Sequence, residues 1–78
     1  MAWPAARGDN GGMEIVLNGN RLPVQEGITV TGLLEAQQLA ERRVAVEVNG
    51  EIVPRGRHAE HVLAAGDTVE IVHALGGG

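Results

Sequence analysis

Apolar residues alternate with polar or small residues in three separate segments of this chain of 78 residues, and this pattern restricts the fold more than any other feature. The segments are residues 13–17, 44–48 and 68–75. Because successive side chains of a β-strand point to opposite faces of its sheet, each segment predicts a strand with one buried face. The buried face of the first strand carries Met13, Ile15 and Leu17. In the last strand, Val69 and Ile71 face the core.

Two short turns join further strands to these segments. Residues 18–20, Asn-Gly-Asn, tolerate positive φ, so the first strand should form a hairpin with residues 22–24, where the alternation resumes. Pro23 cannot donate a ladder hydrogen bond, which makes this second strand an edge strand. The pair Asn49-Gly50 is typical of a type I′ turn and predicts a second hairpin, which leads into a short strand over residues 51–53.

A helix is predicted between the two hairpins. Thr29 can cap a helix whose apolar positions Val30, Leu33 and Leu34 recur at helical spacing. We expect this helix to end near residues 39–40, and a brief helical turn over residues 58–64. The resulting order is two strands, a helix, two strands, a loop and a final strand, which is the order of an α+β β-grasp (ubiquitin-like) fold. In that fold a mixed sheet packs on one main helix, and the terminal strand lies in the middle with its end projecting free.

The composition divides the chain into three parts. Residues 1–12 contain Pro4 and three glycines without periodicity, which predicts a disordered N-terminal extension. Residues 13–75 are expected to form the β-grasp domain. Residues 76–78 are glycines and predict a flexible tail, since glycine loses the most conformational entropy on ordering and has no side chain to pack. Such a slim tail can enter a narrow channel, which makes the carboxylate of Gly78 the candidate reactive group.

The composition also excludes several classes of function. The chain has no cysteine, which excludes disulfides, thiolate metal sites and transfer of sulfur on a side-chain thiol. The net charge is -4 and the six basic residues are all arginines, too few for the basic stripe that nucleic-acid binding needs. No segment resembles a membrane span or a secretion signal. We therefore expect a cytoplasmic protein, monomeric by itself, whose partners are proteins rather than nucleic acid or membrane.

Several short motifs occur in a specific order along residues 13–78. They are Leu17-Asn18-Gly19, Leu33-Leu34, Val44-Ala45-Val46-Glu47-Val48-Asn49, Ile52-Val53-Pro54-Arg55, Gly66-Asp67 and the run from Val69 to Gly78. Each motif is weak by itself, but their order and spacing together resemble the ThiS family of ubiquitin-like sulfur carriers in thiamine biosynthesis. Residues 1–12 have no counterpart in that family's pattern.

The resemblance implies a reaction cycle at Gly78. In this cycle an adenylyltransferase of the ubiquitin-activating type uses ATP and magnesium to adenylate the terminal carboxylate. Sulfur from a donor system then replaces AMP, and the thiocarboxylate delivers sulfur to thiazole synthase. Gly76 and Gly77 would thread the tail into the partner, and this chain would be a co-substrate without a bound cofactor or catalytic residues. Activation is needed because a carboxylate is a poor electrophile until it becomes a mixed anhydride.

Outward-facing positions offer a candidate surface for these partners. Val16, Ala45 and Val72 lie on strands that are expected to neighbour one another, and we predict that they contact a partner together with Leu75. The charged positions beside them are Glu14, Glu47 and Glu70. Scattered exposed valines are also common on monomeric proteins, so a surface without a partner is the alternative.

The histidines suggest little chemistry. His58 and His61 are three residues apart with Glu60 between them, a spacing that could hold a metal, but we expect a solvated turn and no metal site. His73 follows the core-facing period of the last strand, so we expect it to pack at the sheet edge.

Two other functions use the same end of the chain. One is the small subunit of molybdopterin synthase, which shares the terminal chemistry and differs in the acceptor enzyme. The other is a protein modifier that forms isopeptide bonds through Gly78. An enzyme with side-chain catalysis is disfavoured, because the chain has neither cysteine nor lysine and no convincing acid–base pair.

Overall fold

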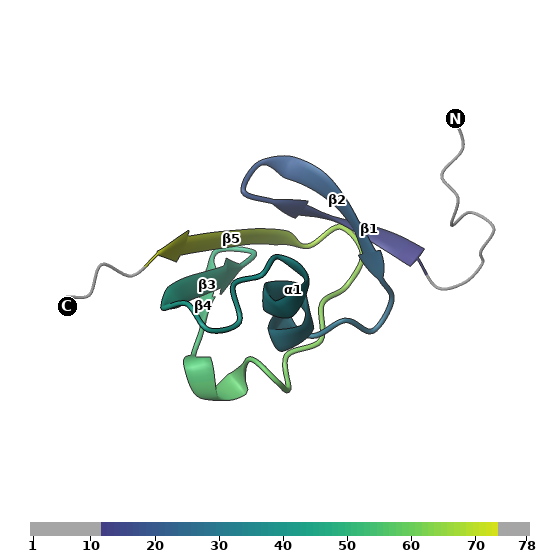
Figure 1. Cartoon of the computed structure of the whole chain (residues 1–78). Coiled ribbons are helices and arrows are strands. Elements are labelled where there is room, and N and C mark those ends of the chain that lie inside the picture. Colours follow the sequence, from purple (N-terminus) through teal and green to yellow (C-terminus); the bar gives the residue numbers. More distant parts are fainter. Residues whose placement is uncertain (1–11, 74–78) are drawn as a thin grey trace.

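The computed structural model describes residues 12–73 (Figure 1). Its elements are β1 (Gly12–Leu17), β2 (Asn20–Gln25), α1 (Val30–Ala36), β3 (Val44–Val48), β4 (Glu51–Val53), the 3-10 helix η2 (Arg55–Arg57) and β5 (Thr68–His73). The first strand begins at Gly12, one residue earlier than the sequence pattern indicates. Residues 1–11 of the predicted extension and the glycine tail over residues 76–78 lie outside the described residues.

The five strands form one mixed sheet in the order β2-β1-β5-β3-β4. Strand β5 lies in the middle, parallel to β1 and antiparallel to β3. Helix α1 packs across one face of this sheet (Figure 1). The arrangement confirms the predicted β-grasp fold, with its last strand at the centre. Strand β2 is at one edge of the sheet, so Pro23 stands on an edge strand as predicted.

Both predicted hairpins form, and each turns on an Asn-Gly pair. Asn18 and Gly19 have φ values of 50° and 87°, and Asn49 and Gly50 have 53° and 86°. Positive φ at both central residues characterises the type I′ turn, whose twist matches that of the flanking strands. The two asparagines therefore occupy left-handed positions that few other side chains tolerate.

Helix α1 begins as predicted. Thr29 is the N-cap, and its Oγ1 accepts a hydrogen bond of 3.0 Å from the Gly32 N–H. Val30, Leu33 and Leu34 are buried against the sheet. At seven residues the helix is short, and no helix among residues 12–73 is both long and apolar enough to cross a membrane.

The helix ends at Ala36, so the predicted end near residues 39–40 was wrong. Gln38 takes a φ of 64°, and its N–H bonds the Glu35 carbonyl at 3.0 Å. The Leu39 N–H reaches back to the Leu34 carbonyl at 2.7 Å. These two bonds form a Schellman motif, which terminates a helix. Glycine usually occupies the left-handed position of that motif, so a glutamine there does not indicate from the sequence that the helix ends.

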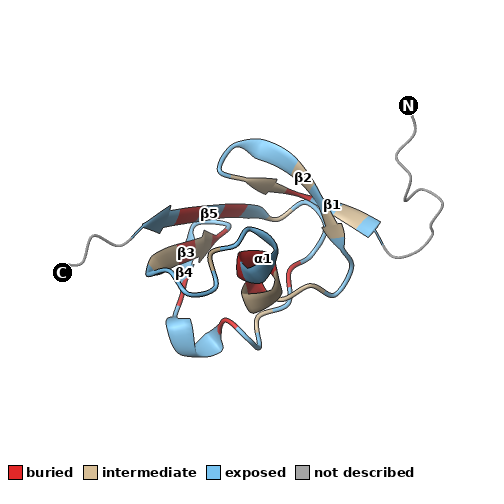
Figure 2. Ribbon diagram, in the orientation of Figure 1, coloured by how far each residue is buried: buried red, intermediate tan, exposed pale blue. Residues whose placement is uncertain are grey.

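The core lies between α1 and the inner face of the sheet, where Figure 2 shows the buried residues. Its side chains are entirely aliphatic: Ile15, Val30, Leu33, Leu34, Val46, Val48, Val53, Leu63, Val69 and Ile71. Burying each such side chain stabilises the fold by about 1.5–3 kcal/mol relative to exposure. The inner positions of β1, β3 and β5 are thus those that the alternation predicts.

The loop between β4 and β5 supports the start of the helix. Only the first part of the predicted helical turn over residues 58–64 forms: directly after η2, the Glu60 and His61 N–H groups both bond the Arg57 carbonyl at 3.0 Å, and no helix follows over the rest of the range. The loop instead supplies backbone acceptors: the Val30 N–H bonds the His61 carbonyl at 3.0 Å, and the Thr31 N–H bonds the His58 carbonyl at 3.1 Å. The first N–H groups of a helix have no partner within it, so the loop satisfies two of them.

Candidate functional site

The predicted reactive end of the chain follows directly on β5. Strand β3 accompanies β5 to its last residue, where Val44 lies opposite His73. Pairing with β1 stops earlier, at Leu17 opposite Val69. Buried residues occupy the middle of β5, whereas its last two residues are exposed (Figure 2). The central strand therefore leaves the core before it reaches the terminal segment.

The terminal segment itself contains four of the predicted site residues. These are Leu75, Gly76, Gly77 and Gly78, and all lie outside the described residues. Of this end of the chain, the described residues therefore include only the strand that leads to this segment. Figure 1 shows β5 running straight to the point from which residues 74–78 continue.

Asn18 continues the pairing of β5 where β1 ends. Its backbone N–H donates to the Val69 carbonyl at 2.8 Å. Its side-chain Oδ1 accepts from the Ile71 N–H at 2.8 Å, and its Nδ2 donates to the Ile71 carbonyl at 3.3 Å. The carboxamide offers one donor and one acceptor, as a peptide group does, so it replaces the next residue of a paired strand. The N–H and carbonyl groups of Ile71 therefore point away from β3. Because these groups alternate in direction along an antiparallel pair, those of Val72 point toward Ala45 on β3.

The other turn asparagine holds the beginning of β5. The Asn49 Oδ1 accepts from the Thr68 N–H at 2.9 Å, and its Nδ2 donates to Asp67 Oδ1 at 3.0 Å. The second carboxylate oxygen of Asp67 accepts from the Ala64 N–H at 2.8 Å. Asparagines from both hairpins thus anchor the central strand, one at each end. The sequence motifs contain both residues, but turn chemistry alone does not indicate these contacts.

The predicted partner-contact residues are divided into two groups on the open face of the sheet. Ala45 and Val72 are directly opposite each other on β3 and β5. Val16 is opposite Thr68, four residues before Val72 on the same strand. Four residues of a strand span about 13 Å, so Val16 is separate from the other two. Val72 is 58% exposed, and Val16 and Ala45 are half-buried.

Two carboxylates and a large apolar side chain adjoin the Ala45–Val72 pair. Glu47 and Glu70 are opposite each other on β3 and β5, and Ile52 on β4 is opposite Glu47. Ile52 is 65% exposed. Strand β4 has only three residues, too few for an alternating pattern to show from the sequence that Ile52 faces outward. We name Ala45, Ile52 and Val72, with the two glutamates, the tail-side patch.

The histidines differ from expectation. His58 was expected in a solvated turn, yet it is only 8% exposed, and its Nε2 donates to the Val53 carbonyl at 3.0 Å. His73 was expected to pack at a sheet edge, but it is exposed and lies at the end of the central strand. His61 is half-buried. Within residues 12–73, no group of three or more His, Cys, Asp or Glu side chains is arranged to hold a metal ion.

Comparisons with known proteins agree with these features. The ThiS family model matches residues 13–78. The curated sulfur carrier protein ThiS of Escherichia coli is 32% identical over 66 residues, which cover 85% of this chain and all of that protein. The crystal structure of the thiamine biosynthesis protein ThiS from Geobacter metallireducens superposes with a TM-score of 0.75 and 36% identity, and covers 85% of this chain and all of that one.

Longer relatives contain a similar segment. A thiazole synthase of Magnetococcus marinus is 42% identical over 66 residues, and one of Paramagnetospirillum magneticum is 41% identical over the same length. In each case the match covers 85% of this chain but only 20% of the relative. The chain therefore spans about one fifth of the length of these two proteins.

Proposed function

The chain belongs to the ThiS family of sulfur carrier proteins, and on this premise we propose that its Gly78 carboxylate carries sulfur for thiazole formation in thiamine biosynthesis. The observation that carries the proposal is the family match, which extends through Gly78. The chain has no cysteine, so sulfur has no side-chain thiol to occupy. The terminal carboxylate is the group that remains.

The chemistry requires activation by a partner. The Gly78 carboxylate attacks the α-phosphorus of ATP, pyrophosphate leaves, and an acyl adenylate forms. A sulfide equivalent from a donor system then attacks the acyl carbon and displaces AMP, which yields the thiocarboxylate. Magnesium and the groups that stabilise the phosphate charge belong to an adenylyltransferase of the ubiquitin-activating type. This chain acts as its co-substrate.

Thiazole synthase is the proposed acceptor of the sulfur. Support comes from the two relatives named thiazole synthase, which contain a segment 41–42% identical to this chain. A carrier that acts on such an enzyme needs a surface that binds and releases it. The tail-side patch suits this role, because it combines exposed apolar side chains with charge and adjoins the last residues of β5.

The geometry of β5 supports presentation of a slim tail. The strand is paired with β3 up to His73 and held by Asn18 at Ile71, so the last described residue has a fixed position in the sheet. Gly76 and Gly77 carry no side chain that could clash with a narrow site. A fixed base and a thin end together let a partner reach the carboxylate while the domain stays folded.

Intact-mass spectrometry tests this proposal. The full chain, co-expressed with an adenylating enzyme of this class and a sulfur donor system, should show one oxygen replaced by sulfur, and fragmentation should locate the change at Gly78. A matched variant lacking Gly78 should show no exchange and the same thermal unfolding midpoint. Persistent absence of the thiocarboxylate in the full chain would refute the carrier function. Capture of a molybdopterin synthase large subunit instead of thiazole synthase would refute the proposed acceptor.

A further inference from the structure

A cavity of about 190 Å³ opens on the helix side of the sheet, near the end of β5. Thr31 and Leu34 of α1 line it together with Val44 of β3. Val44 is the residue opposite His73. The cavity is therefore one strand away from the point where the terminal segment begins, on the face opposite the tail-side patch.

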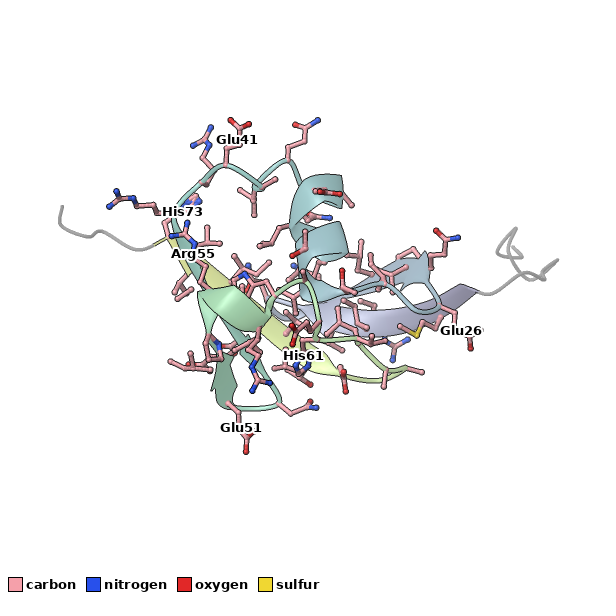
Figure 3. The ribbon with its side chains drawn as sticks, turned by 90° about the horizontal axis from the view of Figure 1, so that it is seen from below. Glu26, Glu41, Glu51, Arg55, His61 and His73 are labelled. Atoms are coloured by element: carbon pink, nitrogen blue, oxygen red, sulfur yellow. The ribbon has the colours of Figure 1, made fainter. Side chains whose placement is uncertain are left out.

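The two charged residues that line this cavity are arginines. Arg42, from the segment that joins α1 to β3, and Arg55, from η2, both line it. No carboxylate is among the described residues that line it. This local charge contrasts with the net charge of -4 for the chain. Figure 3 shows Arg55 and His73 at the end of the molecule from which the terminal segment leaves, with Glu26 at the opposite end.

His58 adds a third polar group to the lining. A carbonyl oxygen can only accept, so the hydrogen bond to Val53 places a proton on Nε2. With the ring protonated only at Nε2, Nδ1 can accept a hydrogen bond but cannot donate one to a carboxylate, so the donors available to such a ligand are those of the two arginines. The cavity volume corresponds to several water molecules, at about 30 Å³ each. An oxyanion and part of its aliphatic stem fit such a space.

We propose that this cavity receives a carboxylate side chain of the adenylating enzyme while that enzyme holds Gly78; the inference rests on the proposed function. Two guanidinium groups match the planar geometry of a carboxylate. Leu34 and Val44 offer an apolar wall for the methylene groups of a glutamate. The contact would orient the domain relative to the site that holds its tail.

The reach of the tail places the enzyme at this end of the domain. Gly78 is five residues beyond His73, so the two are at most about 18 Å apart. An enzyme that encloses the carboxylate must therefore approach the surface around His73, where the cavity opens. Binding of the tail together with the carboxylate fixes two points of contact, which is sufficient to set the direction of approach.

The chain provides matched controls for each arginine. Arg43 follows Arg42, and Arg57 lies two residues after Arg55 in the same short helix, but neither lines this cavity. The substitutions R42Q and R55Q therefore remove the proposed contacts, whereas R43Q and R57Q remove the same charge nearby. All four side chains are exposed, so the variants should fold like the parent.

The first measurement needs no enzyme. The full chain is titrated with glutarate, inorganic phosphate or chloride at constant ionic strength and followed by ¹H–¹⁵N NMR. Glutarate should shift the signals of Thr31, Arg42, Val44, Arg55 and His58 and reach saturation. The shifts should disappear in R42Q and R55Q and persist in R43Q and R57Q. Equal shifts in all four variants, or saturation by phosphate but not by glutarate, would overturn the carboxylate assignment.

The second measurement uses the adenylating enzyme. R42Q and R55Q should raise the KM for the carrier about tenfold, the size expected for loss of a charge-assisted hydrogen bond, and leave kcat unchanged. R43Q and R57Q should keep the parent KM. An unchanged KM in R42Q and R55Q would overturn the docking proposal while the carrier function stands. If the parent chain is never adenylated, the carrier function fails, and the NMR titration still decides whether the cavity binds carboxylates.

Discussion

The side chain of Asn18 forms hydrogen bonds with both backbone groups of Ile71, a residue 53 positions away in the sequence. This contact replaces strand pairing on the side of β5 where β1 has ended. It joins the first hairpin turn to the strand that leads to the terminal glycines. The turn therefore both reverses the chain and holds the last strand, from which residues 74–78 continue.

Asn18→Gly separates these two roles of the turn. Glycine accepts the φ of 50° but loses both side-chain bonds to Ile71. We expect the free energy of unfolding to fall by about 1–3 kcal/mol, for two lost and partly buried hydrogen bonds. Urea unfolding measures this loss, and hydrogen exchange should become faster at the Ile71 amide in particular. An unchanged exchange rate at the Ile71 amide would show that the Asn18 side chain does not hold β5.

Gln38→Gly should stabilise the end of α1. Gln38 has a φ of 64°, a conformation that costs a residue with a Cβ about 1–2 kcal/mol and glycine much less. We expect a gain of about 1 kcal/mol by urea unfolding. The matched control is Gln37→Gly, since Gln37 has a φ of -92° and glycine there only adds entropy to the unfolded chain. Equal effects of the two substitutions would contradict this account of the helix end.

Glu70→Gln should stabilise the isolated domain and weaken its binding. Glu47 and Glu70 are directly opposite each other, and like charges in such a pair destabilise a sheet by about 0.2–1 kcal/mol. Thermal unfolding at low salt should reveal the gain, which should shrink at high salt. If the pair serves a basic partner surface, the same variant should bind thiazole synthase less tightly in a pull-down titration. A variant that gains stability and binds equally well would show that the glutamates do not contribute to partner binding at the tail-side patch.

Val72→Ser tests the apolar part of the tail-side patch. Val72 is 58% exposed, so the substitution should change stability little while it removes apolar contact with a partner. Sulfur transfer to thiazole synthase should show a raised KM for the carrier. Val16→Ser is the matched comparison, because Val16 lies about 13 Å away along the strand direction. A larger effect at Val16 than at Val72 would shift the docking surface toward β1.

Local patterns predicted the strands, both hairpins and the start of the helix. Alternation placed Ile15, Val46 and Val69 in the core, and the Asn-Gly pairs set the turns. These features depend on residues that are near one another in the chain. The order of the elements then sufficed for the β-grasp fold.

Contacts between distant residues could not be predicted in this way. The bonds from Asn18 to Ile71 and from Asn49 to Thr68 depend on strand order, and a turn asparagine has the same local pattern with or without them. The burial of His58 likewise depends on how the loop after η2 packs beneath the helix. The arginine-lined cavity combines residues from three elements and the segments between them, so no motif marks it.

The position of β5 also has a consequence for damaged molecules. In the part of the chain that the structure describes, β5 alone connects the β1–β2 hairpin to the β3–β4 hairpin. A protease that removes this strand would take Val69 and Ile71 out of the core and divide the sheet into two hairpins, and a two-stranded hairpin needs further packing to be stable in water. If the chain acts as the proposed carrier, a copy that loses β5 would lose its tail and its folded surface together, so truncated copies would not compete with intact ones for the proposed partner enzymes.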